Sequence, residues 1–323
     1  MIDRRVCVAP MMDYTDRHCR YLLRLVSPGA LLYTEMVTAQ ALAHGDPERL
    51  LAFDGAEHPV ALQLGGSDPK LLAAAAKLGA ARGYDEINLN VGCPSDRVQS
   101  GRFGACLMAA PGLVADCVRA MREAVAVPVT VKCRIGIDDH DDYDFFARFV
   151  STVRDAGVGT FIVHARKAYL QGLSPRENRE VPPLRYEVPQ RLKRENPDLE
   201  VVLNGGLRSV GDVGEWLPGF DGVMLGRQVW QEPWLLAQLH RAFVDPSWQP
   251  LARHEIVERY AVYAEARLAE GHRLSSLLRP VQGLYSGVAG SRSWRRYLSE
   301  EGVRPGAGVS VLRSSLRVFD VAA

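Results

Sequence analysis

Residues 129–164 read VTVKCRIGIDDHDDYDFFARFVSTVRDAGVGTFIVH. This segment begins with the apolar run Val129–Cys133, continues with a stretch of helical period at Phe145–Ala156, and ends with a second apolar run at Phe161–His164. Such an order is typical of a strand, a crossover helix and a second, parallel strand. Both runs consist largely of apolar residues, as expected of strands that are buried on both faces. The segment therefore predicts one β-α-β unit of a parallel sheet.

The same unit recurs along the first three quarters of the chain. Eight apolar runs are predicted as strands: Val6–Pro10, Leu31–Met36, Val60–Leu64, Glu86–Asn90, Val129–Cys133, Phe161–His164, Val201–Asn204 and Gly222–Leu225. Helices are predicted between them, among others at Pro69–Leu78, Leu113–Val125, Phe145–Ala156 and Pro189–Glu195. Eight strands with helical crossovers in about 240 residues fit a (β/α)8 TIM barrel, whose active site lies at the carboxyl ends of the strands. A doubly wound sheet should instead carry a glycine-rich fingerprint after its first strand, where this chain has Met11-Met12-Asp13-Tyr14.

The pattern changes after Val244, where Asp245–Pro250 is a turn-rich linker and the chain from His254 onward shows helices without further strands. We therefore predict a barrel domain over residues 1–244 and a smaller helical domain over residues 245–323. The region 251–323 has 11 Arg, no Lys and 7 acidic residues, and its cluster of Arg292, Arg295 and Arg296 surrounds Trp294.

Composition narrows the class of protein. The 323 residues are 47% hydrophobic and 24% charged, which fits a globular chain and excludes disordered, collagen-like and coiled-coil chains. The net charge of +1 lacks the basic excess of a general polyanion binder, so contacts with nucleic acid would depend on local patches.

The sequence also predicts where the protein resides. No apolar run approaches the ~18 residues of a membrane helix, and the N-terminus lacks the apolar region of a signal peptide. We therefore expect a cytoplasmic protein without a membrane partner. The six cysteines form no CxxC pair and no Cys/His ligand spacing, so we expect neither a metal site nor a disulfide framework.

Polar side chains stand where nearly every predicted strand ends. A single polar residue at such a junction needs no function, but buried polar groups that converge on one rim indicate a site. The set comprises Glu35, Gln63, Asn90, Cys93, Lys132, Arg134, His164, Arg166, Asn204-Gly205-Gly206 and Gly226-Arg227.

The last two members of this set lie where barrels commonly bind phosphate. Gly205, Gly206 and Gly226 would offer bare backbone N–H groups, and Arg227 would add a bidentate contact. Glycines after a strand can also serve only as tight turns. We favour a ligand that bears a phosphate group.

Cys93 lies in the loop Asn90-Val91-Gly92-Cys93-Pro94-Ser95, near Lys132 and His164 of the next two strands. A loop thiol beside such groups can donate a proton or act as a nucleophile. The alternative is an inert small side chain, which we favour for Cys7, Cys117 and Cys133.

The sixth predicted strand is followed by a long loop, Arg166–Leu184, which carries several arginines together with Tyr169 and Asn178. A solvated charged loop is the simplest interpretation. Long loops in compact domains are often functional, however, and arginines beside aromatic residues suit phosphate contact and base stacking.

Several stretches of the chain are distinctive: Ala9-Pro10-Met11-Met12-Asp13, Tyr33-Thr34-Glu35-Met36, Leu62-Gln63-Leu64-Gly65-Gly66, Asn88–Ser95, Val131-Lys132 and His164-Ala165-Arg166-Lys167. They resemble the tRNA-dihydrouridine synthases, and the subfamily specific for uridines 20 and 20a of the D-loop in particular. The resemblance covers about residues 6–240. The stretches Asp96–Gly101 and Ser174–Glu180 point to that subfamily.

The resemblance implies an enzyme that binds FMN, uses NADPH as reductant and reduces uridine to 5,6-dihydrouridine in tRNA. It implies hydride transfer from flavin N5 to C6 and a proton from Cys93 to C5. FMN would be bound by Pro10, Met11, Met12, Gln63, Lys132, His164, Asn204, Gly205, Gly206, Gly226 and Arg227.

The resemblance also implies contacts with tRNA from Asn90, Arg176, Arg179, Arg292 and Arg295. Our own inference adds Asn90, Lys132 and Arg134 as partners of the uracil carbonyls. Two alternatives stay open: an FMN-dependent oxidoreductase of a free small molecule such as a dihydropyrimidine, and an RNA-binding barrel without catalysis. The oligomeric state is not encoded in any motif, and we take a monomer as the expectation.

Overall fold

The computed structural model describes residues 2–320, and its centre is a closed parallel barrel. Eight strands pair in the order β1-β2-β4-β5-β6-β7-β8-β9, and β9 pairs with β1 to close the ring. The strands are β1 Val6–Val8, β2 Leu31–Tyr33, β4 Val60–Gly65, β5 Glu86–Val91, β6 Val129–Arg134, β7 Thr160–His164, β8 Glu200–Asn204 and β9 Gly222–Leu225. The predicted TIM barrel is confirmed.

One predicted strand is shorter than expected. The run predicted over Leu31–Met36 leaves the barrel after Tyr33, and a two-residue strand β3, Val37–Thr38, then pairs with β4. The Thr34 hydroxyl accepts the hydrogen bond of the Gln63 backbone N–H at 3.0 Å and donates to the Glu35 carbonyl at 2.7 Å. Because a side chain takes the ladder position of a backbone carbonyl, β2 ends there.

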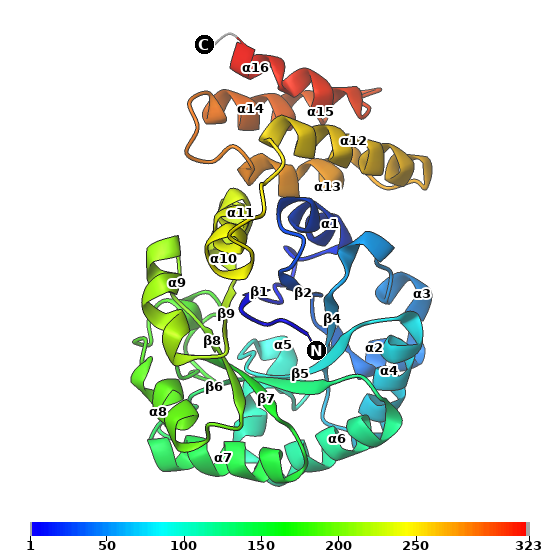
Figure 1. Cartoon of the computed structure of the whole chain (residues 1–323). Helices are drawn as coiled ribbons and strands as arrows, with labels where there is room; N and C mark the ends of the chain where they lie inside the picture. Colours follow the sequence, from blue (N-terminus) through cyan, green and yellow to red (C-terminus); the bar gives the residue numbers. More distant parts are fainter. Residues whose placement is uncertain (1, 321–323) are drawn as a thin grey trace.

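Helices surround the barrel (Figure 1). They are α1 Arg17–Val26, α2 Ala39–His44, α3 Pro47–Leu50, α4 Pro69–Arg82, α5 Asp96–Ser100, α6 Pro111–Ala124, α7 Tyr143–Asp155, α8 Glu187–Glu195, α9 Val210–Trp216, α10 Arg227–Gln231 and α11 Trp234–Leu239. Helix α4 shows how the sequence sets such bounds. Asp68 accepts from the backbone N–H groups of Lys70 and Leu71, Pro69 occupies the first turn, and Gly83 ends the helix at φ 97°.

The inside of the barrel is divided into an apolar and a polar part. Apolar residues from six strands form one small cluster: Cys7, Ala9, Leu31, Tyr33, Ala61, Ile162, Val202 and Met224. Strands β5 and β6 instead place polar residues at alternate positions, because Ile87, Leu89 and Val131 pack in the larger core. Those polar residues are Glu86, Asn88, Asn90, Thr130, Lys132 and Arg134.

The amino end of the barrel is closed by a network of paired charges. The Arg4 guanidinium donates to Glu86 at 3.0 Å and to Glu200 at 2.8 Å, and the side chains of Arg4 and Glu86 are buried. Tyr33 and Thr130 donate their hydroxyls to the other oxygen of Glu86 at 2.7 and 2.6 Å. Burial alone would lower the pKa of Arg4, but the carboxylates of Glu86 and Glu200 raise it overall, so the guanidinium stays charged.

Up to residue 320, the α-helices that follow the barrel are α12 Arg253–Ala269, α13 Leu274–Leu278, α14 Ser291–Glu301, α15 Ser310–Ser315 and α16 Arg317–Asp320. They form a separate block beside α1, α10 and α11 (Figure 1). The Tyr21 ring of α1 stacks on Tyr263 of α12 at 3.8 Å, and the His18 imidazole lies 2.8 Å from the Tyr263 hydroxyl. The division into domains at residues 244 and 245 stays a proposal.

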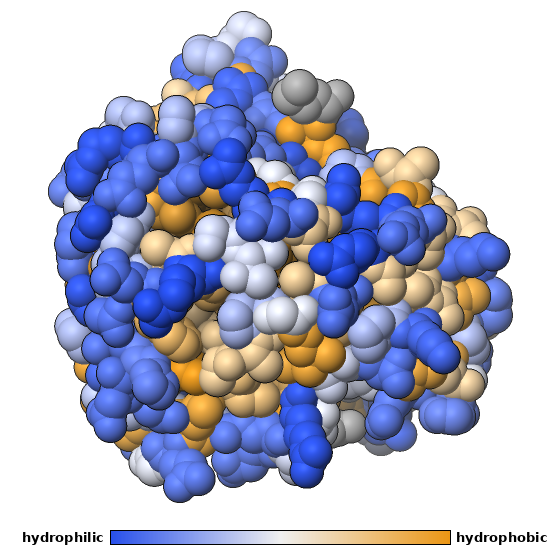
Figure 2. Space-filling model, turned by 90° about the horizontal axis from the view of Figure 1, so that it is seen from below, coloured by the Kyte–Doolittle hydropathy of each residue, from blue (hydrophilic) through white to orange (hydrophobic). Residues whose placement is uncertain are grey.

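The surface opposite the helical block is mixed in character. Figure 2, which views the molecule from below Figure 1, shows hydrophilic residues over much of this face and apolar residues between them. Within residues 2–320, no helix has both the length and the apolar character needed to cross a membrane.

Candidate active site

The carboxyl ends of the strands bring several predicted site residues into contact. Lys132 donates from Nζ to Oδ1 of Asn204 at 2.9 Å, and Asn204 donates from Nδ2 to the Met224 carbonyl at 2.7 Å. A Cβ atom added to Gly205 would lie 2.5 Å from the His164 ring, so His164 and Gly205 are immediate neighbours. We call this end of the barrel, where Asn90, Lys132, His164 and Asn204 lie, the mouth.

Cationic groups dominate the electrostatics of the mouth. Burial, together with Arg134, lowers the pKa of Lys132 to about 8. The pKa of His164 is held well below its ordinary value by burial and by Arg134 and Lys132, so the imidazole is neutral at pH 7. Burial also lowers the pKa of Arg134 to about 10. Neighbouring positive groups disfavour one another's charged form, and a negatively charged ligand would stabilise it.

Gly205 and Gly206 form a close backbone turn after β8. Their φ angles are 114° and 74°, and a Cβ on Gly206 would lie 2.4 Å from Leu184 and 2.6 Å from the Tyr186 hydroxyl. Glycine is required on both grounds, conformation and space. Gly226, after β9, faces Met11, whose sulfur would lie 3.2 Å from an added Cβ. Predicted residues of the loops after β1 and β9 thus lie side by side, and the bond from Asn204 to the Met224 carbonyl links β8 to β9.

Arg227 is already paired in this structure. Its guanidinium contacts the Glu180 carboxylate at 2.5 Å and the Arg179 carbonyl at 3.5 Å, and Glu180 lies 3.8 Å from Arg176. The loop after β7 therefore reaches across to the start of α10. Met11, Tyr14, Arg227 and other residues line a pocket beside this contact.

Cys93 is held in a loop whose backbone is fixed by a side chain of β5. The Asn90 Oδ1 atom accepts from the backbone N–H groups of Gly92 at 3.1 Å and Cys93 at 3.0 Å. The Cys93 thiol is partly exposed and lies 3.4 Å from the Ser95 hydroxyl. Cys7, Cys117 and Cys133 are buried, and burial raises the pKa of Cys133 to about 12. Cys133 packs in the core outside the barrel ring.

Arg134 links the Cys93 loop to the loop after β7. Its guanidinium donates to the backbone carbonyls of Gly92 at 3.1 Å, Lys167 at 3.1 Å and Asn178 at 2.9 Å. Gln99 makes a second link, from its side-chain amide to the carbonyls of Pro94 and Leu170. Arg134, which we predicted to contact a uracil carbonyl, is therefore a buried residue that joins two loops.

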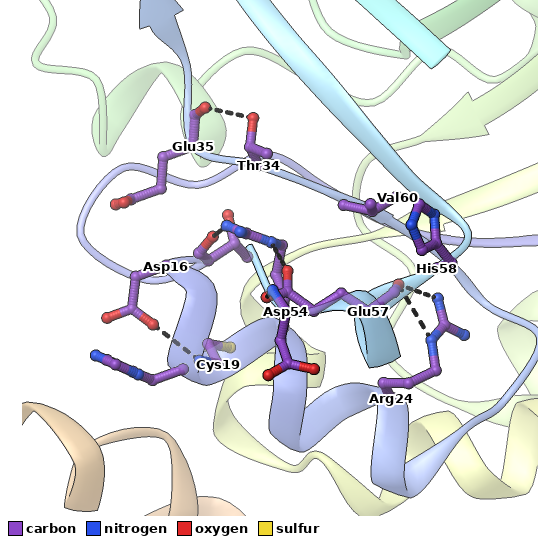
Figure 3. Close-up of polar contacts among 12 residues, drawn as sticks. Asp16, Cys19, Arg24, Thr34, Glu35, Asp54, Glu57, His58 and Val60 are labelled. Carbon is purple, nitrogen blue, oxygen red and sulfur yellow. Dashed lines mark hydrogen bonds and ion pairs between the residues drawn. The ribbon is translucent and has the colours of Figure 1, made fainter. Parts of the chain in front are cut away.

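The loop after β1 is held from two sides. Met11 donates its backbone N–H to the Thr15 hydroxyl at 2.9 Å, and Asp13, at φ 65°, donates its N–H to the Glu35 carboxylate. Figure 3 shows Glu35 and Asp16 here, with Asp16 capping α1 through the Cys19 N–H. Met12 is 51% exposed at this loop.

The predicted tRNA contacts lie on three elements. Arg176 and Arg179 are exposed on the loop after β7, Asn90 is at the mouth, and Arg292 and Arg295 are exposed on α14. Trp294, by contrast, is fully buried against Tyr285 and Phe319. The two arginines of α14 thus share a face that points away from the helical core.

Sequence reasoning overlooked the polar residues below the mouth, namely Glu86, Asn88 and Thr130. Their signal was available, because Glu86, Asn88 and Asn90 alternate with apolar residues in β5. Within residues 2–320, no group of three or more His, Cys, Asp or Glu side chains is arranged to hold a metal ion.

Comparisons with known proteins agree on one family. Residues 7–313 match the family described as Dihydrouridine synthase (Dus). The chain is 56% identical to a tRNA-dihydrouridine(20/20a) synthase of Xanthomonas campestris, over 98% of this chain and 94% of that protein. Proteins of the same name from Shewanella oneidensis and Escherichia coli are each 53% identical, over 97% of this chain and 93% and 91% of theirs.

A solved structure supports the fold alone. A complex of 2-naphthoyl-CoA reductase superposes with a TM-score of 0.55 at 9% identity, over 74% of this chain and 50% of that one.

Proposed function

The chain belongs to the dihydrouridine synthase family, and from this we infer that it is a flavin-dependent oxidoreductase that reduces uridine to dihydrouridine in tRNA. The observation that carries the proposal is the mouth itself. There, cationic and glycine-backbone groups gather around an opening that a partly exposed thiol adjoins.

FMN is the flavin that the residues fit. Gly205 and Gly206, at φ 114° and 74°, form a backbone turn after β8, and backbone N–H groups at such a turn suit the binding of a phosphate. Lys132 and Arg227 supply positive charge, and Met11, beside Gly226, supplies an apolar surface for a flat ring. Bound FMN would supply a hydride to C6 of uracil, and NADPH would supply the electrons.

The chain's own residues then complete the addition to the C5=C6 bond. The hydride forms a bond at C6, the electrons of the double bond move toward C5, and the Cys93 thiol gives its proton to C5. Asn90 and Lys132 are the proposed donors to the uracil carbonyls, where negative charge develops. Arg134 supports this chemistry by holding the Cys93 loop, since its donors are engaged by backbone carbonyls.

Arg176, Arg179, Arg292 and Arg295 are proposed to contact tRNA, because all four are exposed and positively charged. The relatives named above act on positions 20 and 20a, and we propose the same positions in the D-loop for this chain. The target base must leave its stack to reach the mouth. A monomeric state and a cytoplasmic location stay predictions.

An oxidoreductase of a free small molecule is the competing function. It leaves the exposed arginines of α14 without a role, since a small ligand does not need a second contact surface. The choice of substrate also separates the two functions, because a tRNA-specific enzyme should not reduce free uridine in place of tRNA.

Replacing Cys93 tests the proposed chemistry. Cys93→Ala should slow dihydrouridine formation in tRNA by about 100-fold or more, the usual contribution of a general acid. Flavin content and NADPH oxidation should stay near wild type. The matched control is Cys106→Ala, which removes another partly exposed thiol, one that donates to the Phe103 carbonyl. Full activity in Cys93→Ala would remove this residue from the mechanism.

A further inference from the structure

A chain of side-chain hydrogen bonds runs through the inside of the barrel, from the Cys93 loop to the paired charges at the amino end. Asn90 donates from Nδ2 to Oε1 of Gln63 at 2.8 Å, and Gln63 donates from Nε2 to Oδ1 of Asn88 at 2.8 Å. Asn88 donates to the Thr130 hydroxyl at 2.8 Å, and Thr130 donates to Glu86 at 2.6 Å. Every member of this chain is buried.

The loop end of the chain fixes the orientation of the first amide. Backbone N–H groups can only donate, so the Asn90 atom that faces Gly92 and Cys93 must be the oxygen. The amide nitrogen of Asn90 therefore points to Gln63, whose facing atom must then be its oxygen. The same logic orients Asn88 in turn.

The carboxylate end fixes the same direction independently. Glu86 is paired with Arg4 and accepts from Tyr33, so Thr130 must be a donor toward it. Burial and the neighbouring Glu86 raise the pKa of Tyr33, which keeps its hydroxyl protonated. With its proton directed at Glu86, Thr130 can only accept from Asn88. Both ends thus require every bond to run from the mouth toward the amino end.

This direction determines what Asn90 can offer to a ligand. Its oxygen already accepts two backbone N–H groups, and one of its two amide protons is used on Gln63. The remaining group is one N–H donor. A reversed amide would offer an acceptor instead.

We propose that Asn88 and Thr130 are positioning residues that hold Asn90 as a donor and so select a pyrimidine with a 4-carbonyl, uracil, over one with a 4-amino group, cytosine. This inference rests on the proposed function. Uracil and cytosine share the 2-carbonyl and the reducible C5=C6 bond but differ at N3 and at position 4, and we place the Asn90 donor opposite position 4. A donor N–H pairs with a carbonyl and opposes an amino group, and buried unpaired donors are costly.

The first test uses the wild-type protein with its flavin reduced under anaerobic conditions. Two tRNA transcripts differ only in carrying uridine or cytidine at the reduced position, and flavin absorbance reports oxidation. We expect the cytidine transcript to oxidise the flavin at least ~100-fold more slowly. Equal rates with both transcripts would overturn this inference and leave the proposed function standing. If neither transcript oxidises the flavin, the proposed function fails and the inference falls with it.

The second test asks whether Thr130 sets the discrimination. Thr130→Val keeps the shape but removes the hydroxyl, and we expect the uridine-to-cytidine rate ratio to fall about 10-fold, whereas Thr130→Ser should restore it. The matched control is Thr160→Val, which removes a hydroxyl that donates to Glu200 at 2.8 Å outside the chain of amides. An unchanged ratio in folded Thr130→Val would contradict the proposal.

Asn90→Asp keeps the test decisive if Thr130→Val does not fold. The aspartate retains an oxygen for the two loop N–H groups but has no amide proton to offer, so the rate ratio should also fall about 10-fold. A ratio equal to that of wild type in this variant would overturn the role of the Asn90 donor.

Discussion

Both ends of the barrel interior are rich in charged groups, but only the amino end pairs each positive group with a carboxylate of the same chain. At the amino end, Arg4 lies between the carboxylates of Glu86 and Glu200, and its pKa is raised. At the mouth, burial lowers the pKa of both Lys132 and Arg134, and nearby positive groups lower it further: Arg134 acts on Lys132, and Arg179 and Arg166 act on Arg134. One end satisfies its charges within the chain, whereas the other leaves positive charge for a ligand.

The difference separates a structural network from a binding site. A buried charge needs a partner, and the chain provides opposite charges at the amino end but only neutral oxygen atoms to Lys132 and Arg134 at the mouth. Residues that lower the stability of the ligand-free protein indicate a functional site, because ligand binding offsets the destabilisation. The contrast predicts opposite responses to mutation at the two ends.

Glu86→Ala should have the largest effect on stability. It leaves Arg4 partly unpaired in the interior and removes the acceptor of Tyr33 and Thr130, so the free energy of unfolding should fall by about 3–5 kcal/mol. Urea denaturation measures the change. The control is Glu48→Ala, whose exposed partner is Arg82 and whose effect should stay below about 1 kcal/mol. Equal effects from both variants would mean that the amino-end network is not structural.

Lys132→Met should stabilise the flavin-free protein at neutral pH. The folded pKa of about 8 lies below the ordinary 10.5, so the native state carries a cost at pH 7 that disappears as the pH rises past 10.5. We expect the variant to exceed wild type by up to about 3 kcal/mol at pH 7, and the gap to close near pH 10.5. A gap that widens with rising pH would contradict this account.

The same variant should lose flavin. Lys132 is proposed to face FMN, so Lys132→Met should weaken FMN binding by at least ~10-fold, measured by flavin fluorescence on titration. A variant that is less stable without flavin and binds FMN as well as wild type would place Lys132 among structural residues.

Substitutions of Arg227 and Glu180 should have effects of intermediate size on FMN binding. If Arg227 contacts the phosphate, Arg227→Ala should weaken FMN binding by about 10-fold. Glu180→Gln removes the paired carboxylate and should tighten FMN binding only slightly, because an exposed ion pair is weak. Unchanged flavin retention in Arg227→Ala would assign the phosphate to backbone groups alone.

The smallest effect is expected on the helical block. Arg295→Ala should weaken tRNA binding modestly and reduce the slope of log affinity against log salt by about 1. Arg313→Ala is the control, because Arg313 is paired with Glu258 at 3.1 Å. Binding curves at several salt concentrations give both quantities. Identical slopes for Arg295→Ala and wild type would argue against α14 as an RNA contact.

The barrel could be predicted from sequence because its strands are short apolar runs. Val129–Arg134 and Thr160–His164 differ from their predicted bounds by at most one residue at either end. Strand β2 was predicted too long because the hydrogen bond that ends it joins Thr34 to Gln63, 29 residues away. Local patterns cannot show such a partner.

The location of the candidate site and several of its residues could be predicted from the sequence, but the contacts of the individual side chains could not. Lys132, His164 and Gly205 were found because each lies at or just after the carboxyl end of a strand, and these strand ends meet at one rim. The role of Arg134 was missed because its partners are carbonyls of two loops, which a sequence does not place. The alternation in β5 could have placed Asn88 inside the barrel, but it could not give the direction of the hydrogen bonds of Asn88 and Thr130, because both ends of a chain that crosses three strands set it.

One measurement tests the central claim, that the cationic mouth holds a flavin which serves RNA. The purified protein is reduced under anaerobic conditions and mixed with tRNA that lacks dihydrouridine, and flavin absorbance is followed over time. We predict rapid oxidation by tRNA and none by free uridine at the same concentration. A reduced flavin that tRNA leaves unchanged, or a purified protein that binds no flavin, would contradict the claim.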